Sequence, residues 1–172
     1  MAETGLVTLR PATLDDIPAL VALGRAVVPP TYGPIDPVYA QRMIDEWWTP
    51  GVFTRSMQTN LHLAAEVDGQ VVALATLGRL SRSYRAFPHV TGDREVMWKL
   101  YVHPDHHGHG IGSRLLGEVE SRVEGDELWL EVVDGNDRAV AFYRDRGFEE
   151  VERTPDGGPE PDDVWMRKRL TR

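Results

Sequence analysis

A turn containing three glycines joins an apolar strand to an amphipathic helix in the middle of the chain, and this unit restricts the possible folds most strongly. Residues 95–102 have the apolar character of a strand, which Pro104 ends. Residues 111–124 then place Ile111 and Leu115 on one side of a predicted helix. The glycines of the turn are Gly108, Gly110 and Gly112. The unit therefore predicts a domain that mixes helices with strands.

The rest of the chain adds further strands and helices around this unit. Asp68-Gly69 suits a two-residue turn and joins predicted strands at 62–67 and 70–77 into a hairpin. Further strands are predicted at 5–10, 127–133, 148–153 and 164–170, and helices at 13–27, 37–48, 53–59 and 138–146. Pro29-Pro30 is expected to end the first helix, and Pro50-Gly51 the second. Without a repeat or a second core, the prediction is a single α+β domain over residues 5–172.

The composition excludes several kinds of protein. With 172 residues, of which 41% are apolar, the chain has the length and the material for one sizeable core. It has no cysteine, which excludes disulfides, thiolate nucleophiles and cysteine-ligated metals. Its net charge of −8 disfavours nonspecific binding to nucleic acid or to an anionic membrane. Since no apolar run approaches the roughly 20 residues of a membrane span, we expect a cytoplasmic protein.

The glycine turn has the properties of a phosphate-binding site. Glycines let the backbone approach a ligand closely, and the first N–H groups of a helix lack partners and carry partial positive charge. A flexible loop would also explain the glycines when they are considered alone. The turn matches neither the dinucleotide fingerprint, which wants Gly-x-Gly-x-x-Gly after the first strand of a parallel unit, nor the P-loop, which ends in Gly-Lys-Ser/Thr.

Two linked motifs carry a resemblance to a known family. The turn reads His107-Gly-His-Gly110-Ile-Gly112 and follows a strand that ends in Val102. A second motif, from Asn136 through Tyr143 to Gly147-Phe148, follows the strand at 128–132. Together they resemble the pyrophosphate-binding and following motifs of the GNAT superfamily of N-acetyltransferases, and the resemblance covers nearly the whole chain. It implies a mixed, mostly antiparallel central sheet flanked by helices, in which strands 95–102 and 127–133 are parallel and splayed at the cofactor site.

The resemblance also implies an acetyl-CoA site. Backbone groups of the strand that ends in Val102 would pair with the pantetheine arm like an added strand. The turn would hold the pyrophosphate, and Asn136 would line the opposite side or simply cap the helix that follows it. The implied cofactor-binding residues are Leu100, Tyr101, Val102, His107, Gly108, His109, Gly110, Ile111, Gly112, Ser113 and Asn136.

For the chemistry, the resemblance implies direct acetyl transfer to a primary amine in a ternary complex. Because the chain has no cysteine, no cysteinyl acyl-enzyme can form. Glu95 is our candidate general base, either directly or through water, although it could be a solvated carboxylate at a strand start. Tyr143 matches the family position that protonates the leaving thiolate, although it could simply pack beside Phe142. The backbone N–H of Val102 would polarise the thioester carbonyl.

Four of the six histidines lie within seven residues, which raises the possibility of a metal site. They are His103, His106, His107 and His109. Since Pro104 and the glycines do not preorganise ligands, we expect no metal cofactor. His107 stands where the family usually has Gln or Arg. Because an imidazole is positively charged only when protonated, we expect tighter CoA binding at mildly acidic pH.

The sequence says less about the acceptor and other partners. Arg79, Arg82, Arg85 and Arg94 occupy or flank a predicted loop at 79–94, and residues 149–163 are strongly acidic. A positive and a negative segment together would suit an amine that also carries a carboxylate, such as an amino acid. A protein N-terminus or a lysine remains open as the acceptor, as does a homodimer. The alternative function is a non-catalytic module that binds CoA or a partner.

Overall fold

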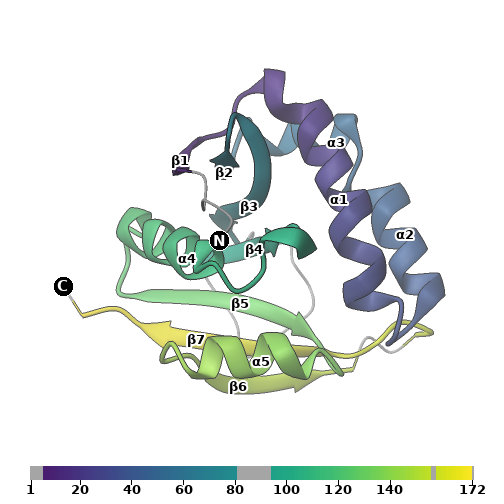
Figure 1. Cartoon of the computed structure of the whole chain (residues 1–172). Helices are drawn as coiled ribbons and strands as arrows, with labels where there is room; N and C mark the ends of the chain where they lie inside the picture. The colour runs from purple at the N-terminus through teal and green to yellow at the C-terminus, as the bar shows by residue number, and fades with distance from the viewer. Residues whose placement is uncertain (1–5, 81–93, 156–157, 172) are drawn as a thin grey trace.

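The computed structural model describes residues 6–80, 94–155 and 158–171, and its strands form one seven-stranded mixed sheet (Figure 1). The strand order is β1-β2-β3-β4-β5-β7-β6. Among the described strands, β4 and β5 are the one parallel pair of neighbours, and the other neighbouring pairs are antiparallel. The strands are β1 (Val7–Pro11), β2 (Leu61–Val67), β3 (Gln70–Arg79), β4 (Glu95–Val102), β5 (Glu127–Val133), β6 (Glu149–Thr154) and β7 (Asp163–Arg169). The predicted α+β fold with one parallel pair is confirmed.

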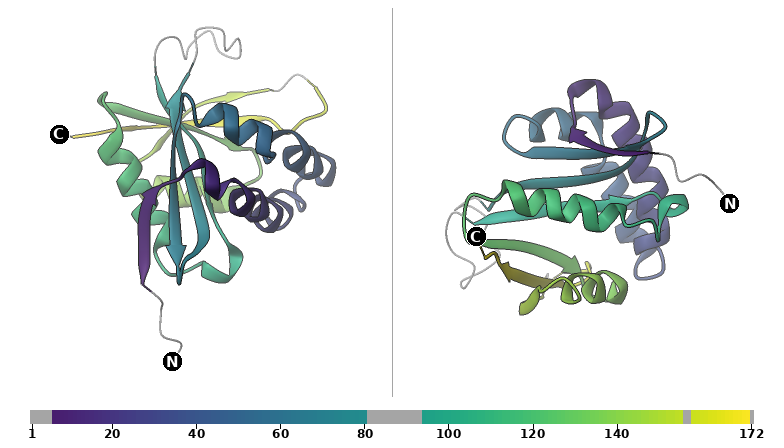
Figure 2. Two further views of the ribbon diagram at one scale, coloured as in Figure 1. Left: turned by 90° about the horizontal axis from the view of Figure 1, so that it is seen from above. Right: turned by 60° about the vertical axis from the view of Figure 1, so that its left-hand side comes forward.

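Helices cover both faces of this sheet, as the two views in Figure 2 show. One face packs on α1 (Ile17–Tyr32), α2 (Pro37–Trp47) and α3 (Pro50–Ser56). The other packs on α4 (Ile111–Arg122) and α5 (Asp137–Arg144). Two short 3-10 turns, η1 (Leu14–Asp16) and η2 (Pro104–His106), complete the elements. A layer of buried side chains therefore lies on each side of the strands.

The first helix extends further than the sequence predicts, because it continues through Pro29 and Pro30 to Tyr32. Prolines inside a helix remove backbone hydrogen bonds and would be expected to end it. Here the last turn buries Val28 and Tyr32 completely or nearly so, and the Thr31 hydroxyl donates to the carbonyl of Val27 at 2.6 Å. Tertiary burial thus outweighs the local preference. As a consequence, the aromatic ring of Tyr32 reaches the middle of the sheet.

The helix predicted at 53–59 begins earlier than expected, at Pro50. Pro50 occupies the first turn, where a missing N–H costs nothing, and the Thr49 side chain caps the helix by accepting from the N–H of Val52. The proline that was expected to end α2 therefore also starts α3.

The parallel pair separates after two registered residue pairs, and this separation positions the site. Pairing between β4 and β5 covers Val96 with Trp129 and Met97 with Leu130. An irregularity opposite Thr76 and Leu77 of β3 inserts Trp98 as an extra residue in β4. Beyond Met97 and Leu130 the two strands diverge, and a gap opens between them.

Over residues 6–80, 94–155 and 158–171, no helix is long and apolar enough to cross a membrane.

Candidate active site

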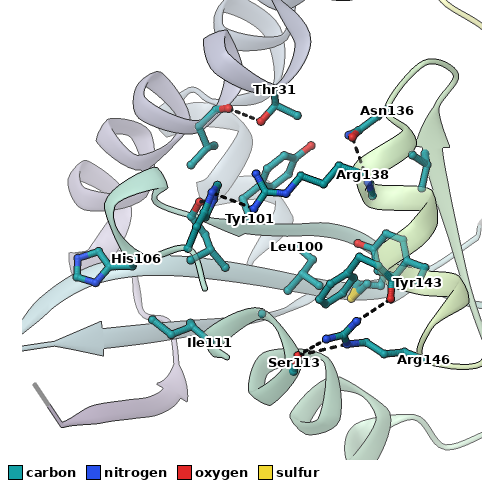
Figure 3. A pocket seen from close by; sticks show the side chains of 18 of the residues that line it. Thr31, Leu100, Tyr101, His106, Ile111, Ser113, Asn136, Arg138, Tyr143 and Arg146 are labelled. Carbon is teal, nitrogen blue, oxygen red and sulfur yellow. Dashed lines mark hydrogen bonds between the residues drawn. The ribbon is translucent and has the colours of Figure 1, made fainter. Parts of the chain in front are cut away.

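A cavity of about 470 Å³ lies at the gap between β4 and β5 and is lined from both faces of the sheet (Figure 3). Thr31 and Tyr32 of α1 line it on one face. Ile111 of α4, together with Tyr143 of α5, lines it on the other. The cavity therefore connects the two layers of the protein through the sheet, and two molecules approaching from opposite faces could meet there.

The glycine turn forms one end of this cavity. Gly108 and Gly110 adopt φ angles of 80° and 75°, which side chains with a Cβ rarely adopt. Gly110 is the N-cap of α4, and no side chain caps this helix end. The first N–H groups of α4 are thus available at the cavity, where an anion would complete their hydrogen bonds.

The edge of β4 supplies further backbone groups. The N–H of His103 donates to the carbonyl of Val72 in β3 at 2.8 Å, and backbone groups alternate in direction along a strand. The backbone groups of Tyr101 therefore face β3, whereas those of Leu100 and Val102 face the gap toward β5. An extended ligand in the gap could pair with them as an added strand.

His107 connects the turn to both walls of the cavity. Its Nε2 lies 2.8 Å from the carbonyl oxygen of Val102, and its Nδ1 lies 3.2 Å from a guanidinium nitrogen of Arg138. Since the guanidinium can only donate, Nδ1 accepts and Nε2–H donates, which requires a neutral imidazole. The expectation that CoA binds more tightly at mildly acidic pH stays a prediction.

Two arginines from the second motif line the cavity near the turn. Arg138 extends from the start of α5 across the cavity toward β4 (Figure 3). Arg146 stacks on the ring of Phe142, with its guanidinium carbon 3.6 Å from the ring centre, and donates to the Ser113 hydroxyl at 2.6 Å. In an acidic protein this end of the cavity is thus locally positive.

Three tyrosines meet at the centre of the cavity. The hydroxyls of Tyr32 and Tyr101 are hydrogen-bonded at 2.6 Å, and the ring of Tyr143 packs edge-on against Phe142 and Phe148. Burial raises the pKa of Tyr32 to about 12 and raises the pKa of Tyr143 above its ordinary value. Within the part of the chain that the structure describes, no residue hydrogen-bonds the Tyr143 hydroxyl, so its proton is available to a ligand.

Glu131 is the carboxylate of the cavity, and the sequence prediction missed it. It lies in β5 directly after the last paired residue, Leu130, and its Oε2 is buried without a hydrogen-bond partner. Burial, together with the charge of Asp163, raises the pKa of Glu131 to about 8, and the charge of Lys99 opposes this rise. A charged residue within the apolar strand 128–133 was the signal that could have identified it.

Glu95 does not line the cavity. Its carboxylate accepts from the N–H groups of Glu124 and Gly125 at 2.8–3.1 Å, beyond the end of α4. The side chain is 8% exposed and lies on the face that packs on α4. Glu95 thus holds the α4–β5 connection in place, and its role as a general base stays a prediction.

The structure brings together most of the implied cofactor-binding residues. Those that line the cavity are Leu100, Tyr101, Val102, His107, Gly108, Gly110, Ile111, Gly112, Ser113 and Asn136. His109 does not line it. Asn136 also caps α5, because its side-chain oxygen accepts from the N–H of Ala139 at 3.2 Å, so the capping role is real and is compatible with a place in the cavity wall.

The arginines that suggested an acceptor site have other roles where the structure describes them. Arg79 pairs with Glu124, and Arg94 pairs with Glu127 and stacks on Trp129. Arg82 and Arg85 lie outside the described residues. The charged residues that line the cavity are instead Glu131, Arg138 and Arg146.

The histidines form no metal site in the described ranges, where no group of three His, Asp or Glu side chains could hold a metal ion. His103 accepts from the N–H of Asp105 at 3.3 Å, and its ring packs edge-on against His106. These contacts shape the η2 turn that precedes the glycines.

The splayed parallel pair lies next to a glycine turn and an uncapped helix N-terminus. This arrangement suits a class of proteins that hold an extended, phosphate-bearing ligand between two strands. Residues 25–148 match the model of the acetyltransferase (GNAT) family. The chain therefore belongs to the GNAT family of acetyltransferases.

Curated relatives resemble parts of the chain. It is 34% identical over 111 residues to the N-alpha-acetyltransferase RimI of Mycobacterium tuberculosis, covering 62% of this chain and 65% of that protein. It is 30% identical over 99 residues to the L-amino acid N-acyltransferase MnaT of Escherichia coli, and the match covers 56% of this chain and 54% of that protein. The matched segments thus span less than two thirds of these relatives.

Solved structures share the fold over nearly the whole chain. The PaiA N-acetyltransferase of Thermoplasma acidophilum, in complex with coenzyme A, superposes with a TM-score of 0.78 at 21% identity and covers 96% of this chain and 99% of that one. The ribosomal-protein-S18-alanine N-acetyltransferase of Escherichia coli superposes with a TM-score of 0.67 at 19% identity and covers 97% of this chain and 96% of that one. At these identities the likeness concerns the fold alone.

Proposed function

We propose that the protein transfers an acetyl group from acetyl-CoA to a primary amine by direct attack. The observation that carries this proposal is the separation of β4 and β5 beside the glycine turn, which leaves the backbone groups of Leu100 and Val102 facing the cavity. Membership of the acetyltransferase family and the structural likeness to a protein in complex with coenzyme A support it.

The residues of the cavity suit the parts of acetyl-CoA. The amide groups of the pantetheine arm would pair with Leu100 and with the N–H of Val102, as an added strand does. The pyrophosphate would accept from the first N–H groups of α4, with Arg138 supplying positive charge. Since His107 donates to the Val102 carbonyl, that oxygen is already satisfied.

Acetyl-CoA supplies the thioester, and the residues of the chain manage two protons. Glu131 would take a proton from the ammonium group of the acceptor, since a carboxylate with a pKa of about 8 is a competent base near neutral pH. The amine nitrogen then forms a bond to the carbonyl carbon and the carbon–sulfur bond breaks. Tyr143, whose raised pKa keeps it protonated, would donate its proton to the thiolate. The nitrogen loses its second proton as the amide forms, and this proton would restore the Tyr143 hydroxyl.

The names of the relatives suggest which amines to test. RimI is an N-alpha-acetyltransferase and MnaT an L-amino acid N-acyltransferase, so both names point to α-amines. We propose an α-amine as the acceptor of this protein as well, either on a free amino acid or at a peptide N-terminus.

A thiol-release assay with acetyl-CoA and a panel of amines tests the proposal. We expect CoA thiol to appear at a rate that depends on the amine, with an acetylated product of the amine detected by mass spectrometry. Binding of acetyl-CoA without thiol release for any amine would instead establish the non-catalytic alternative. Absence of acetyl-CoA binding by calorimetry would contradict both acetyl transfer and a CoA-binding module, and would leave only a module that binds a partner.

A further inference from the structure

Lys99 does not line the cavity itself but lies in β4 between Trp98 and Leu100, which do, and it points to the face that packs on α1, α2 and α3. The extra residue Trp98 in β4 turns Lys99 and Tyr101 to this face, whereas Met97 packs on the α4 side. The Lys99 Nζ stands 5.3 Å from the centre of the Trp48 ring. Burial lowers the pKa of Lys99 to about 8, and the charge of Glu131 opposes this lowering. The ammonium group is therefore close enough to Glu131 to interact with it electrostatically.

Among the residues that the structure describes, neither of these two groups has an ion-pair partner. Within the described part of the chain, Lys99 forms no ion pair of 4.0 Å or less with Glu131 or with any other carboxylate. The Oε2 of Glu131 is buried without a partner. Both residues follow the last paired residues of the diverging strands, Met97 and Leu130. Lys99 and Glu131 thus stand on the two strands that border the same opening, and both point to the face of the sheet that packs on α1.

A buried charge without a partner is costly, so a ligand that satisfies both groups binds better than one that satisfies a single group. The ammonium group of an acceptor would pair with Glu131, which is also where the proposed base must act. A carboxylate on the same molecule would pair with Lys99 by a charge-assisted hydrogen bond. Amino acids carry these two groups on one carbon atom.

We propose that Lys99 binds the α-carboxylate of the acceptor and makes the enzyme selective for free amino acids. The inference rests on the proposed acetyl transfer and specifies its substrate class. A diamine would place a second cation near Lys99 and be repelled. A peptide N-terminus or an amino acid amide would leave Lys99 without an anion.

The experiment measures kcat/KM for each of the common L-amino acids and for the matching amino acid amide, a tripeptide and a diamine. We expect the wild-type enzyme to prefer the acid over its amide by about ten- to a hundredfold, the effect of one charge-assisted hydrogen bond. Lys99→Met abolishes this preference, and Lys99→Arg restores most of it because the cation is retained.

Lys168 provides a matched control, since Lys99 and Lys168 are the two lysines of the chain. Lys168 pairs with Glu120, away from the cavity, so Lys168→Met keeps the preference for the acid. A second readout does not depend on turnover: labelling of Lys99 by trinitrobenzenesulfonate, located by peptide mass spectrometry, slows when the preferred amino acid is present, whereas labelling of Lys168 does not.

The possible results separate the two proposals. In one result, the enzyme acetylates amides, peptides or diamines as efficiently as the acids, and Lys99→Met does not change the ratio of these rates. This result overturns the role of Lys99 and leaves the acetyltransferase function intact. An absence of acetylation for every acceptor overturns the proposed function itself. If Lys99→Met does not fold, three other results decide whether Lys99 binds the carboxylate. They are the wild-type ratio of kcat/KM for the acid to that for the amide, the same ratio for Lys99→Arg, and the labelling of Lys99.

Discussion

Glu95 and Glu131 lie on the neighbouring parallel strands β4 and β5, but their carboxylates point to opposite faces of the sheet. Glu95 accepts from the backbone N–H groups of Glu124 and Gly125 on the side of α4. Glu131 faces the cavity, and one of its oxygens is buried without a partner. One carboxylate is thus engaged by the protein and the other is left for a ligand, and the two make different experimental predictions.

Glu131→Gln is expected to reduce kcat by a hundredfold or more, because a positioned general base contributes about 10²–10⁴. Acetyl-CoA affinity should change by less than about twofold. Only the ionised carboxylate can accept the proton, and the pKa of Glu131 is raised to about 8. With an amino acid amide as acceptor, which does not depend on the charge of Lys99, wild-type kcat/KM should therefore rise as the pH increases toward 8, and the variant should lose this dependence. Steady-state rates between pH 6 and 9.5 check both points.

Glu95→Gln provides the comparison. Losing the charge that accepts from two backbone N–H groups should lower the free energy of unfolding by about 1–3 kcal/mol, measured in urea. The rise of kcat/KM toward pH 8 should persist. A variant of normal stability that loses this pH dependence would return the role of base to Glu95.

Tyr143→Phe is expected to lower turnover much more than acetyl-CoA affinity. The hydroxyl has no partner among the described residues, whereas the ring packs on Phe142 and Phe148 and is retained in the variant. Loss of the proton donor should cost about 10²–10⁴ in kcat, and isothermal calorimetry should give a similar dissociation constant. Unchanged turnover would show that Tyr143 only packs.

The sequence predicts the order of elements because periodicity and turn residues are local. It places Leu100, Val102, the glycine turn, Asn136 and Tyr143 at one site through two linked motifs, and the structure brings them to one cavity. It could not place Glu95 and Lys99, because the extra residue Trp98 reverses the alternation of side chains along β4. With strict alternation Glu95, Lys99 and Tyr101 would share a face. That irregularity depends on pairing with β3, which is a property of the assembled sheet.

Arg138→Met should weaken acetyl-CoA binding by about ten- to a hundredfold, since Arg138 extends into the cavity toward the turn where the pyrophosphate would lie. Binding of acetyl-pantetheine, which has no phosphate, should be unaffected. Equal losses of affinity for acetyl-CoA and acetyl-pantetheine would place Arg138 elsewhere than at the phosphates.

His107→Gln should bind acetyl-CoA nearly as well as the wild type, because an amide can donate to the Val102 carbonyl and accept from Arg138.

His62 should make the protein less stable in acid. It is 3% exposed, and its ring nitrogens bond the hydroxyls of Thr76 and Ser56 at 3.0 and 2.9 Å. Burial, with a smaller contribution from the charge of Lys99, lowers the pKa of His62 to about 4. In the unfolded chain the same group takes up its proton near its ordinary value of 6.5.

Between pH 6.5 and 4 the unfolded state therefore binds a proton that the folded state does not, and stability falls as the pH falls. From pH 7 to pH 5 this group alone should lower the free energy of unfolding by about 2 kcal/mol. His62→Gln keeps polar atoms near both hydroxyls and has no titrating ring. Urea unfolding at the two pH values should give a decrease that is about 2 kcal/mol smaller for the variant than for the wild type. Equal decreases would mean that the buried imidazole is already protonated in the folded protein at pH 5, with the hydroxyls of Ser56 and Thr76 accepting from it.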